Sequence, residues 1–114
     1  MNTELKTERV SVYAPKAEHG GRYLSIAQIR NHNEDIGHHF FSADTMRWFS
    51  SKVYADLHLG CYFITSEMNK YATHPKREYT IRHANGTGNI DTVGVFGGYA
   101  SLKSARSALA KLEA

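Results

Sequence analysis

The middle of the chain alternates apolar and polar residues in the way that predicts β-strands. From Val53 to Ala100, β-branched and aromatic residues are dense, and turn residues separate the runs. We expect strands over residues 52–59, 61–66, 77–83 and 89–96, with 67–76 as a loop. Asn85-Gly86 is a strong hairpin signal. The last run does not alternate cleanly, so we expect a bulge or a change of exposure near 92–94.

Helical spacing appears on both sides of this region. Ser25 to Gln28 fits a capping box, and Gly37 is a natural stop, so we predict a partly buried surface helix over 26–36, with Asn33 as a gap in its apolar stripe. The last segment repeats apolar residues at helical intervals after a Ser101 cap. This stripe should cover one face of the sheet, and it consists of Leu102, Ala105, Leu109 and Leu112.

A second short helix is predicted after Ser42, over the sequence ADTMRWF. Around it lie four aromatic residues that we expect to form one end of the core: Phe40, Phe41, Trp48 and Phe49. Truncating a buried aromatic ring costs roughly 3–5 kcal/mol. Trp48→Ala is therefore predicted to be among the most damaging single changes.

Together these patterns predict an α+β fold, with an antiparallel sheet of about four or five strands and a C-terminal helix packed on it. We expect one domain over residues 1–114, because 114 residues can bury a core without disulfides or a structural metal. Within it, 8–50 should hold a strand, read at 9–14, and an N-terminal helical part, and 52–114 the sheet and the last helix.

Composition and charge indicate the cellular compartment of the protein but say little about its function. The chain has 41% hydrophobic and 22% charged residues, a net charge of +3 and a pI of about 9.1. This mild positive charge counts against an acidic DNA mimic. No apolar run approaches the ~18 residues of a membrane span, and MNTELKTERV does not look like a signal peptide. Cys61 is the single cysteine, so no disulfide can form within the chain, which favours the reducing cytoplasm.

Histidines and the cysteine raise the question of a metal or thiol site. His38 and His39 are adjacent and should point in opposite directions in an extended link. Asp56 and His58 share a strand face, with Cys61 beyond a glycine, but the paired short spacings of a zinc site are missing. We therefore expect no metal or other cofactor.

A thiol mechanism would pair Cys61 with His58 or His83. No sequence feature orients such a base or builds an oxyanion hole, and a buried thiol is the ordinary interpretation. The glycine-rich segments 83–90 and 96–101 are interpreted as turns, because neither has the spacing of a phosphate-binding loop. We accordingly expect no catalytic residues.

Cations and a tyrosine gather between residues 67 and 83. They could contact phosphates and stack a base, bind an acidic protein partner, or simply lie in solvent. His74 belongs to this stretch as well. The candidate partner-binding residues are Lys70, Tyr71, Lys76, Arg77 and Arg82.

Four short segments resemble a family of small uncharacterised proteins from phages, prophages and actinobacterial mobile elements. They are Thr45 to Phe49, Tyr62 to Glu67, Ile90 to Gly94, and Tyr99 to Ser101. The resemblance covers about residues 24–106 and departs from the family pattern at Trp48, a larger aromatic residue, and at Val95, where an acidic residue is expected.

The resemblance implies a phage accessory protein and carries across no catalytic residue. We expect a non-enzymatic binder of a host protein or ribonucleoprotein complex, which inhibits it by occluding a surface, as anti-CRISPR defence inhibitors do. Two alternatives remain open: a basic nucleic-acid-binding module, and a small metal- or thiol-dependent enzyme.

Overall fold

The fold is α+β, as the sequence predicts, and it is built on a four-stranded antiparallel sheet. A computed structural model describes residues 23–68 and 73–112. The strands follow the order β1-β2-β3-β4, each antiparallel to the next. The elements are α2 (Ile26–Asp35), α3 (Ala43–Trp48), β1 (Lys52–Val53), β2 (Tyr62–Met68), β3 (Arg77–Ala84), β4 (Ile90–Val93) and α4 (Leu102–Ala110). The strand predicted over 9–14 lies outside the described residues.

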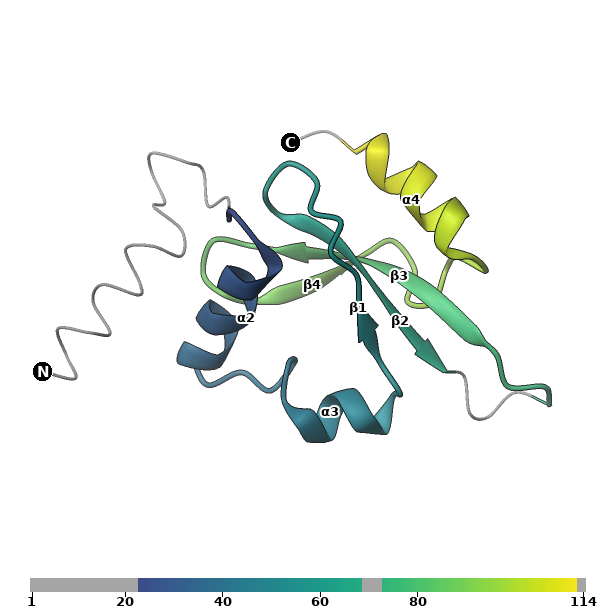
Figure 1. Cartoon of the computed structure of the whole chain (residues 1–114), viewed down its shortest axis with the longest axis horizontal. Helices are drawn as coiled ribbons and strands as arrows, with labels where there is room; N and C mark the ends of the chain where they lie inside the picture. Colours follow the sequence, from purple (N-terminus) through teal and green to yellow (C-terminus); the bar gives the residue numbers. More distant parts are fainter. Residues whose placement is uncertain (1–22, 69–72, 113–114) are drawn as a thin grey trace, which may run out of the picture.

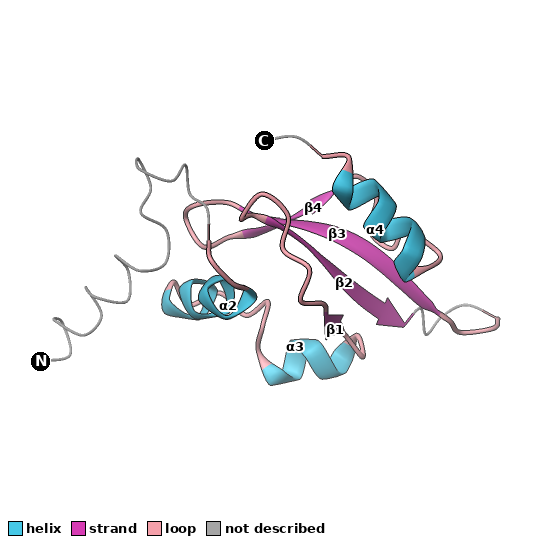
Figure 2. Ribbon diagram, turned by 45° about the horizontal axis from the view of Figure 1, so that its top comes forward, coloured by secondary structure: helices cyan, strands magenta, loops and turns pink. Residues whose placement is uncertain are grey.

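Helices cover both faces of the sheet. Figures 1 and 2 show α4 on one side, with α2 and α3 on the other. Side chains of successive strand residues point to opposite faces, so β2 sends Ile64 and Ser66 towards α4, and Phe63, Thr65 and Glu67 towards the other helices. Because both faces are covered, the polar residues of β2 are buried together with the apolar ones.

The C-terminal helix packs as its apolar stripe predicts. Ser101 caps it, since its hydroxyl oxygen accepts a hydrogen bond from the Ser104 backbone N–H at 3.1 Å. Ala105 and Leu109 are buried against Ile64 and Ile81, while the two outer leucines of the stripe are partly buried in the same cluster. The prediction that this helix covers one face of the sheet is confirmed.

The opposite face holds a second apolar cluster, which anchors α2 more firmly than its thin stripe suggests. Ile29 is buried there with Phe41 and Phe63. Asn33 is no gap: it is fully buried, and its side-chain Nδ2 donates to the Gly88 carbonyl at 2.9 Å. Gly88 has a φ of +93°, and a Cβ atom on it would meet His32 at 3.2 Å, so this close approach of helix and hairpin favours glycine.

The strand predicted over 52–59 is much shorter in the structure. β1 ends at Val53, the chain departs from the ladder over residues 55–57, and it meets β2 again in a single bridge between His58 and Tyr62. It then turns back through Leu59 and Gly60, whose φ angles are 55° and 71°. Leu57 packs into the cluster around Phe63 without joining a ladder. The alternation in this segment therefore reflects packing of side chains on the core, and the prediction of a full strand is wrong.

The aromatic end of the core is also smaller than predicted. Phe41 is buried, but Phe49 is 38% exposed and Trp48 is 64% exposed. Met46 packs against the core, and a residue two positions later lies about 200° around a helix. Trp48 therefore points away from the core, so the core role predicted for it is wrong.

The predicted irregularity near 92–94 is real and shapes the molecule. β4 ends at Val93, and Gly94 follows with a φ of +78°. The chain then loops outward and returns to β3, where the Tyr79 backbone N–H donates to the Tyr99 carbonyl at 2.8 Å. This outward turn, residues 94–98, carries Phe96 over the face that also bears α3.

A candidate binding pocket over a buried ion pair

A buried ion pair lies on the sheet face opposite α4. The register of β2 and β3 places Thr65 opposite Thr80 and Phe63 opposite Arg82. Arg82 Nη2 lies 3.2 Å from Glu67 Oε2, and the two side chains are only 10% and 6% exposed. Burying charges is costly unless they are paired and hydrogen-bonded, so the surrounding contacts decide whether this site is stable.

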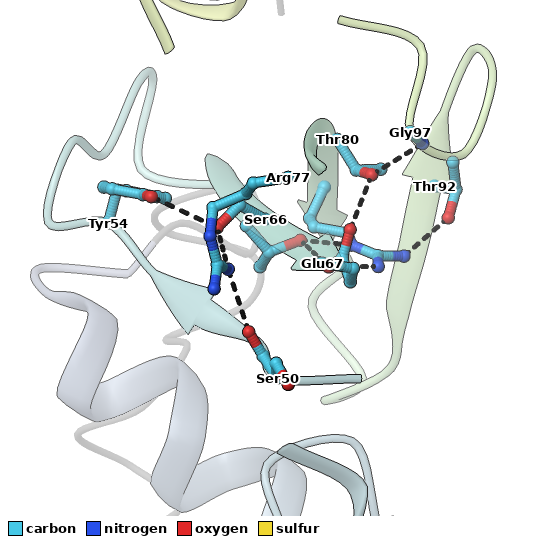
Figure 3. A network of polar contacts seen from close by, with 10 residues as sticks. Ser50, Tyr54, Ser66, Glu67, Arg77, Thr80, Thr92 and Gly97 are labelled. Carbon is cyan, nitrogen blue, oxygen red and sulfur yellow. Dashed lines mark hydrogen bonds and ion pairs between the residues drawn. The ribbon is translucent and has the colours of Figure 1, made fainter. Parts of the chain in front are cut away.

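Threonine hydroxyls satisfy the Glu67 carboxylate. Thr65 Oγ1 donates to Oε2 at 2.7 Å, and Thr80 Oγ1 donates to Oε1 at 3.0 Å. Thr80 Oγ1 also accepts from the Gly97 backbone N–H at 2.8 Å, as Figure 3 shows for the labelled residues. The 94–98 turn is thereby tied to the ion pair through one hydroxyl group.

The guanidinium of Arg82 is held by two threonine hydroxyls and contacts two aromatic rings. Its Nε donates to Thr65 Oγ1 at 3.0 Å, and its Nη1 donates to Thr92 Oγ1 at 2.6 Å. Its central carbon lies 5.1 Å from the Phe40 ring centroid and 5.3 Å from that of Phe96, which is within cation–π range. Burial lowers the pKa of Arg82, and Glu67 partly opposes this effect; an arginine nevertheless stays charged in a protein.

A pocket of about 220 Å³ opens above this pair. Glu67 and Arg82 are the most buried of its lining residues, and we call them its floor. The other lining residues are mainly aromatic or apolar. The lining residues are His38, His39, Phe40, Thr45, Met46, Phe49, Ser51, Glu67, Arg82 and Phe96. They come from the α2–α3 connection, α3, the sheet and the 94–98 turn, so the pocket exists only in the folded chain.

The two adjacent histidines stand together in the wall of the pocket. Their rings stack at 4.9 Å with an interplanar angle of 23°. The prediction that they point in opposite directions is wrong, because the chain turns on both sides of them: the His38 backbone N–H donates to the Asn33 carbonyl and the Ser42 N–H donates to the His39 carbonyl. His38 Nδ1 accepts from the Phe40 backbone N–H at 3.2 Å, which fixes the ring beside the aromatic wall.

Large apolar side chains are exposed beside the pocket, and we call them the aromatic rim: Trp48, Phe49, Val95 and Phe96. Their exposed fractions run from 38% to 71%. Phe49 and Phe96 make an edge-on contact with ring centroids 6.3 Å apart. Trp48 and Val95 are the chain neighbours of these two rings, so the rim consists of two exposed pairs that meet where the Phe49 and Phe96 rings touch.

The basic residues singled out in the sequence do not form one exposed patch. Arg82 is buried in the ion pair, which corrects its expected place among exposed cations. Arg77 is half-buried and donates to the Ser50 carbonyl and to Ser66 Oγ, both at 2.8 Å (Figure 3). Lys76 is exposed, while Lys70 and Tyr71 lie outside the described residues. Whether any of these positions binds a partner stays a prediction.

The metal and thiol candidates are engaged elsewhere. Asp56 forms a two-point ion pair with Arg106 at 2.9 and 3.2 Å. His58 Nε2 donates to the Leu112 carbonyl at 2.9 Å, and His83 Nδ1 lies 3.8 Å from a carboxylate oxygen of Asp91. Across residues 23–68 and 73–112, no three His, Cys, Asp or Glu side chains gather closely enough to hold a metal ion. Over the same residues, no helix is long and apolar enough to cross a membrane.

Sequence reasoning missed Glu67 and Phe96 as site residues. The loop predicted over 67–76 begins too early, because β2 continues to Met68. The spacing of two after Phe63 and Thr65 was the available signal that Glu67 lies on their face of the strand. Phe96 gave no comparable signal, because its position depends on the outward turn after β4.

Comparison with known proteins identifies a family and no function. No curated protein and no solved structure matches this chain. A family pattern described as a family of unknown function, DUF7447, matches residues 25–110, which include every residue that lines the pocket. On this match the chain belongs to the DUF7447 family.

Proposed function

We propose that this protein is a non-catalytic binding protein that docks on a host macromolecule through the aromatic rim and the pocket beside it. The observation that carries the proposal is that the exposed Phe49 and Phe96 rings are in contact, each beside a further exposed apolar residue, Trp48 or Val95. Single exposed apolar residues are ordinary, but contiguous apolar patches mark interaction sites.

The anatomy of this surface resembles that of a binding hot spot. Such sites are rich in tryptophan and other aromatic anchors and lie next to well-packed pockets that exclude water. Here the exposed Trp48 directly precedes Phe49, one of three phenylalanines that line the pocket. Outside it, Arg47 and Asp44 form a largely exposed ion pair at 3.0 Å, which suits the polar border of an interface.

The polar groups of the pocket support binding better than catalysis. Glu67 is committed to two threonine hydroxyls and to Arg82. Arg82 is in turn fixed by Thr65, Thr92 and two ring faces. A pair held in this way is suited to fix the shape of a pocket, because its atoms have little freedom to move during a reaction.

Within this class we propose an inhibitor of a host machine that acts by occluding a working surface of its target. The support is the resemblance of four sequence segments to small phage and prophage proteins, the setting in which anti-CRISPR and other defence inhibitors occur. The partner would be a protein or ribonucleoprotein complex.

The test is capture of a partner by matched variants of the full chain. Trp48→Ser and Phe96→Ser remove rim anchors, and Lys103→Ser alters an exposed residue of α4 on the other side of the sheet. We expect the same host protein to be retained by wild type and Lys103→Ser, with a loss of about tenfold or more in the two rim variants. Circular dichroism should show all four proteins folded.

Two results would contradict the proposal. Equal capture by all four proteins would show that the rim is not the contact surface. No protein above the level of a tag-only control would remove the support for a host partner. If capture disappears after nuclease treatment and falls steeply from 50 to 200 mM salt, the protein is a nucleic-acid binder.

A further inference from the structure

We propose that the pocket above Glu67 and Arg82 receives a phenol group, namely the side chain of a tyrosine of the docked partner. The role of a partner rests on the proposed function. The chemistry of the occupant rests on the pocket alone, in which a polar floor lies at the end of an aromatic chamber.

The floor of the pocket can both donate and accept hydrogen bonds. A guanidinium carries five N–H donors, and the contacts of Arg82 within the described residues use three of them, towards Thr65, Glu67 and Thr92. A carboxylate offers about four acceptor positions, and Glu67 uses three, towards Thr65, Thr80 and Arg82. These contacts leave two N–H donors and one acceptor position unused, on two side chains that both line the pocket.

Charge favours a neutral occupant. Glu67 and Arg82 compensate each other at 3.2 Å, so a carboxylate or phosphate in the pocket would face the glutamate, and an ammonium group would face the arginine. Either would be an additional charge taken out of water, which is costly. A hydroxyl group carries no charge, donates one hydrogen bond and accepts others, which complements both members of the pair.

The walls favour an aromatic body for that hydroxyl. Phe40, Phe49 and Phe96 line the pocket together with Met46, and both ring faces and a thioether make favourable contacts with an inserted ring. A volume of about 220 Å³ is below the ~300–1,000 Å³ of pockets for drug-sized ligands. It suits one small ring, and tyrosine is the residue that joins such a ring to a hydroxyl and is enriched at hot spots.

A nucleobase is the nearest competitor, and the charges around the pocket argue against it. A nucleotide brings a phosphate group, which proteins neutralise with lysine and arginine. Among the described residues that line the pocket, Arg82 is the one such cation, and it is already paired with Glu67. The described lining therefore offers a nucleotide phosphate no lysine or unpaired arginine.

The experiment titrates the ¹⁵N-labelled full chain with p-cresol and toluene, which differ only in the hydroxyl group. We expect p-cresol to shift the amide signals of Met46, Arg82 and Gly97 and to bind about tenfold more tightly than toluene, because its hydroxyl gains hydrogen bonds to charged groups. Equal binding of the two probes would overturn the proposal, as would shifts confined to other parts of the chain. Tighter binding of guanosine than of p-cresol would overturn it in favour of a base.

Matched variants locate the probe. Phe96→Ala removes one lining side chain of the pocket and should weaken p-cresol binding at least fivefold. Lys103→Ala, at an exposed position of α4 on the other side of the sheet, should leave p-cresol binding unchanged. Equal effects of the two changes would refute the pocket. If the full chain captures a host partner but binds p-cresol no more tightly than toluene, this inference alone is refuted. If it binds p-cresol more tightly than toluene but captures no partner, only the proposed function is refuted.

Discussion

Arg82→Met is the change that tests the buried ion pair most directly. It removes the cation but keeps an unbranched side chain of similar course between the Phe40 and Phe96 rings, which lie 5.1 and 5.3 Å from the guanidinium carbon. Glu67 would keep its two threonine donors but lose the arginine that balances its charge. Its side chain is only 6% exposed, so water could not replace that partner. Removing one partner of a buried pair costs about 3–5 kcal/mol.

This loss is large compared with the whole free energy of unfolding, which is about 5–15 kcal/mol for a typical domain. The assay is urea unfolding followed by circular dichroism. With a slope near the lower part of the usual range, about 1.5 kcal/mol per molar urea, the midpoint should fall by roughly 2–3 M. An unchanged slope would show that the variant unfolds from the same compact state.

The double change Arg82→Met with Glu67→Gln separates the charge effect from packing. Glutamine keeps an acceptor and adds a donor near Thr65 and Thr80, so the double variant leaves no uncompensated charge. We expect it to be less destabilised than the sum of the two single variants by at least about 2 kcal/mol. Additivity within about 0.5 kcal/mol, or a cost below about 1 kcal/mol for Arg82→Met, would refute the assignment of this pair as a coupled buried contact.

Two further predictions follow from burial. Burial raises the pKa of Tyr23 to about 12, above its value of about 10 in an unfolded chain. Between pH 10 and 12 the Tyr23 hydroxyl therefore stays protonated in the folded state and loses its proton in the unfolded state. The free energy of unfolding should fall over this range by no more than about 2.7 kcal/mol. Urea midpoints over this range should show that Tyr23→Phe lacks this loss, and parallel curves for the two proteins would contradict the shift. Trp48→Ala should cost less than about 1 kcal/mol of stability, because the ring is 64% exposed. Leu109→Ala should cost about 2–5 kcal/mol, because Leu109 is only 5% exposed. If thermal or urea unfolding shows Trp48→Ala to be the more destabilising change, the burial argument is refuted.

Much of the fold could be predicted because its signals are local. The stripe of α4 needs only a spacing of three and four residues, and Ser25, Ser42 and Ser101 cap their helices as predicted. The Asn85-Gly86 hairpin likewise joins neighbouring strands. Such features depend on backbone geometry over a few residues, which the order of side chains is enough to specify.

The candidate site could be predicted far less well, because its residues are brought together from distant segments. Arg82 was singled out as a cation beside an exposed loop, and nothing near it in sequence indicates that Phe40 and Phe96 enclose it. Trp48 illustrates the opposite error: its size favours burial, but its position on a helix whose core-facing residue is Met46 decides against it.

The sequence by itself determined the antiparallel α+β framework, the helix caps and the apolar surface beneath α4, since these follow from periodicity and from the conformational preferences of single residues. Only the tertiary structure decided that the second sheet face is covered as well. That covering desolvates Glu67 and Arg82, pairs them, and leaves a pocket beside an exposed aromatic rim, because burial is a property of everything that packs around a residue and not of the residue itself.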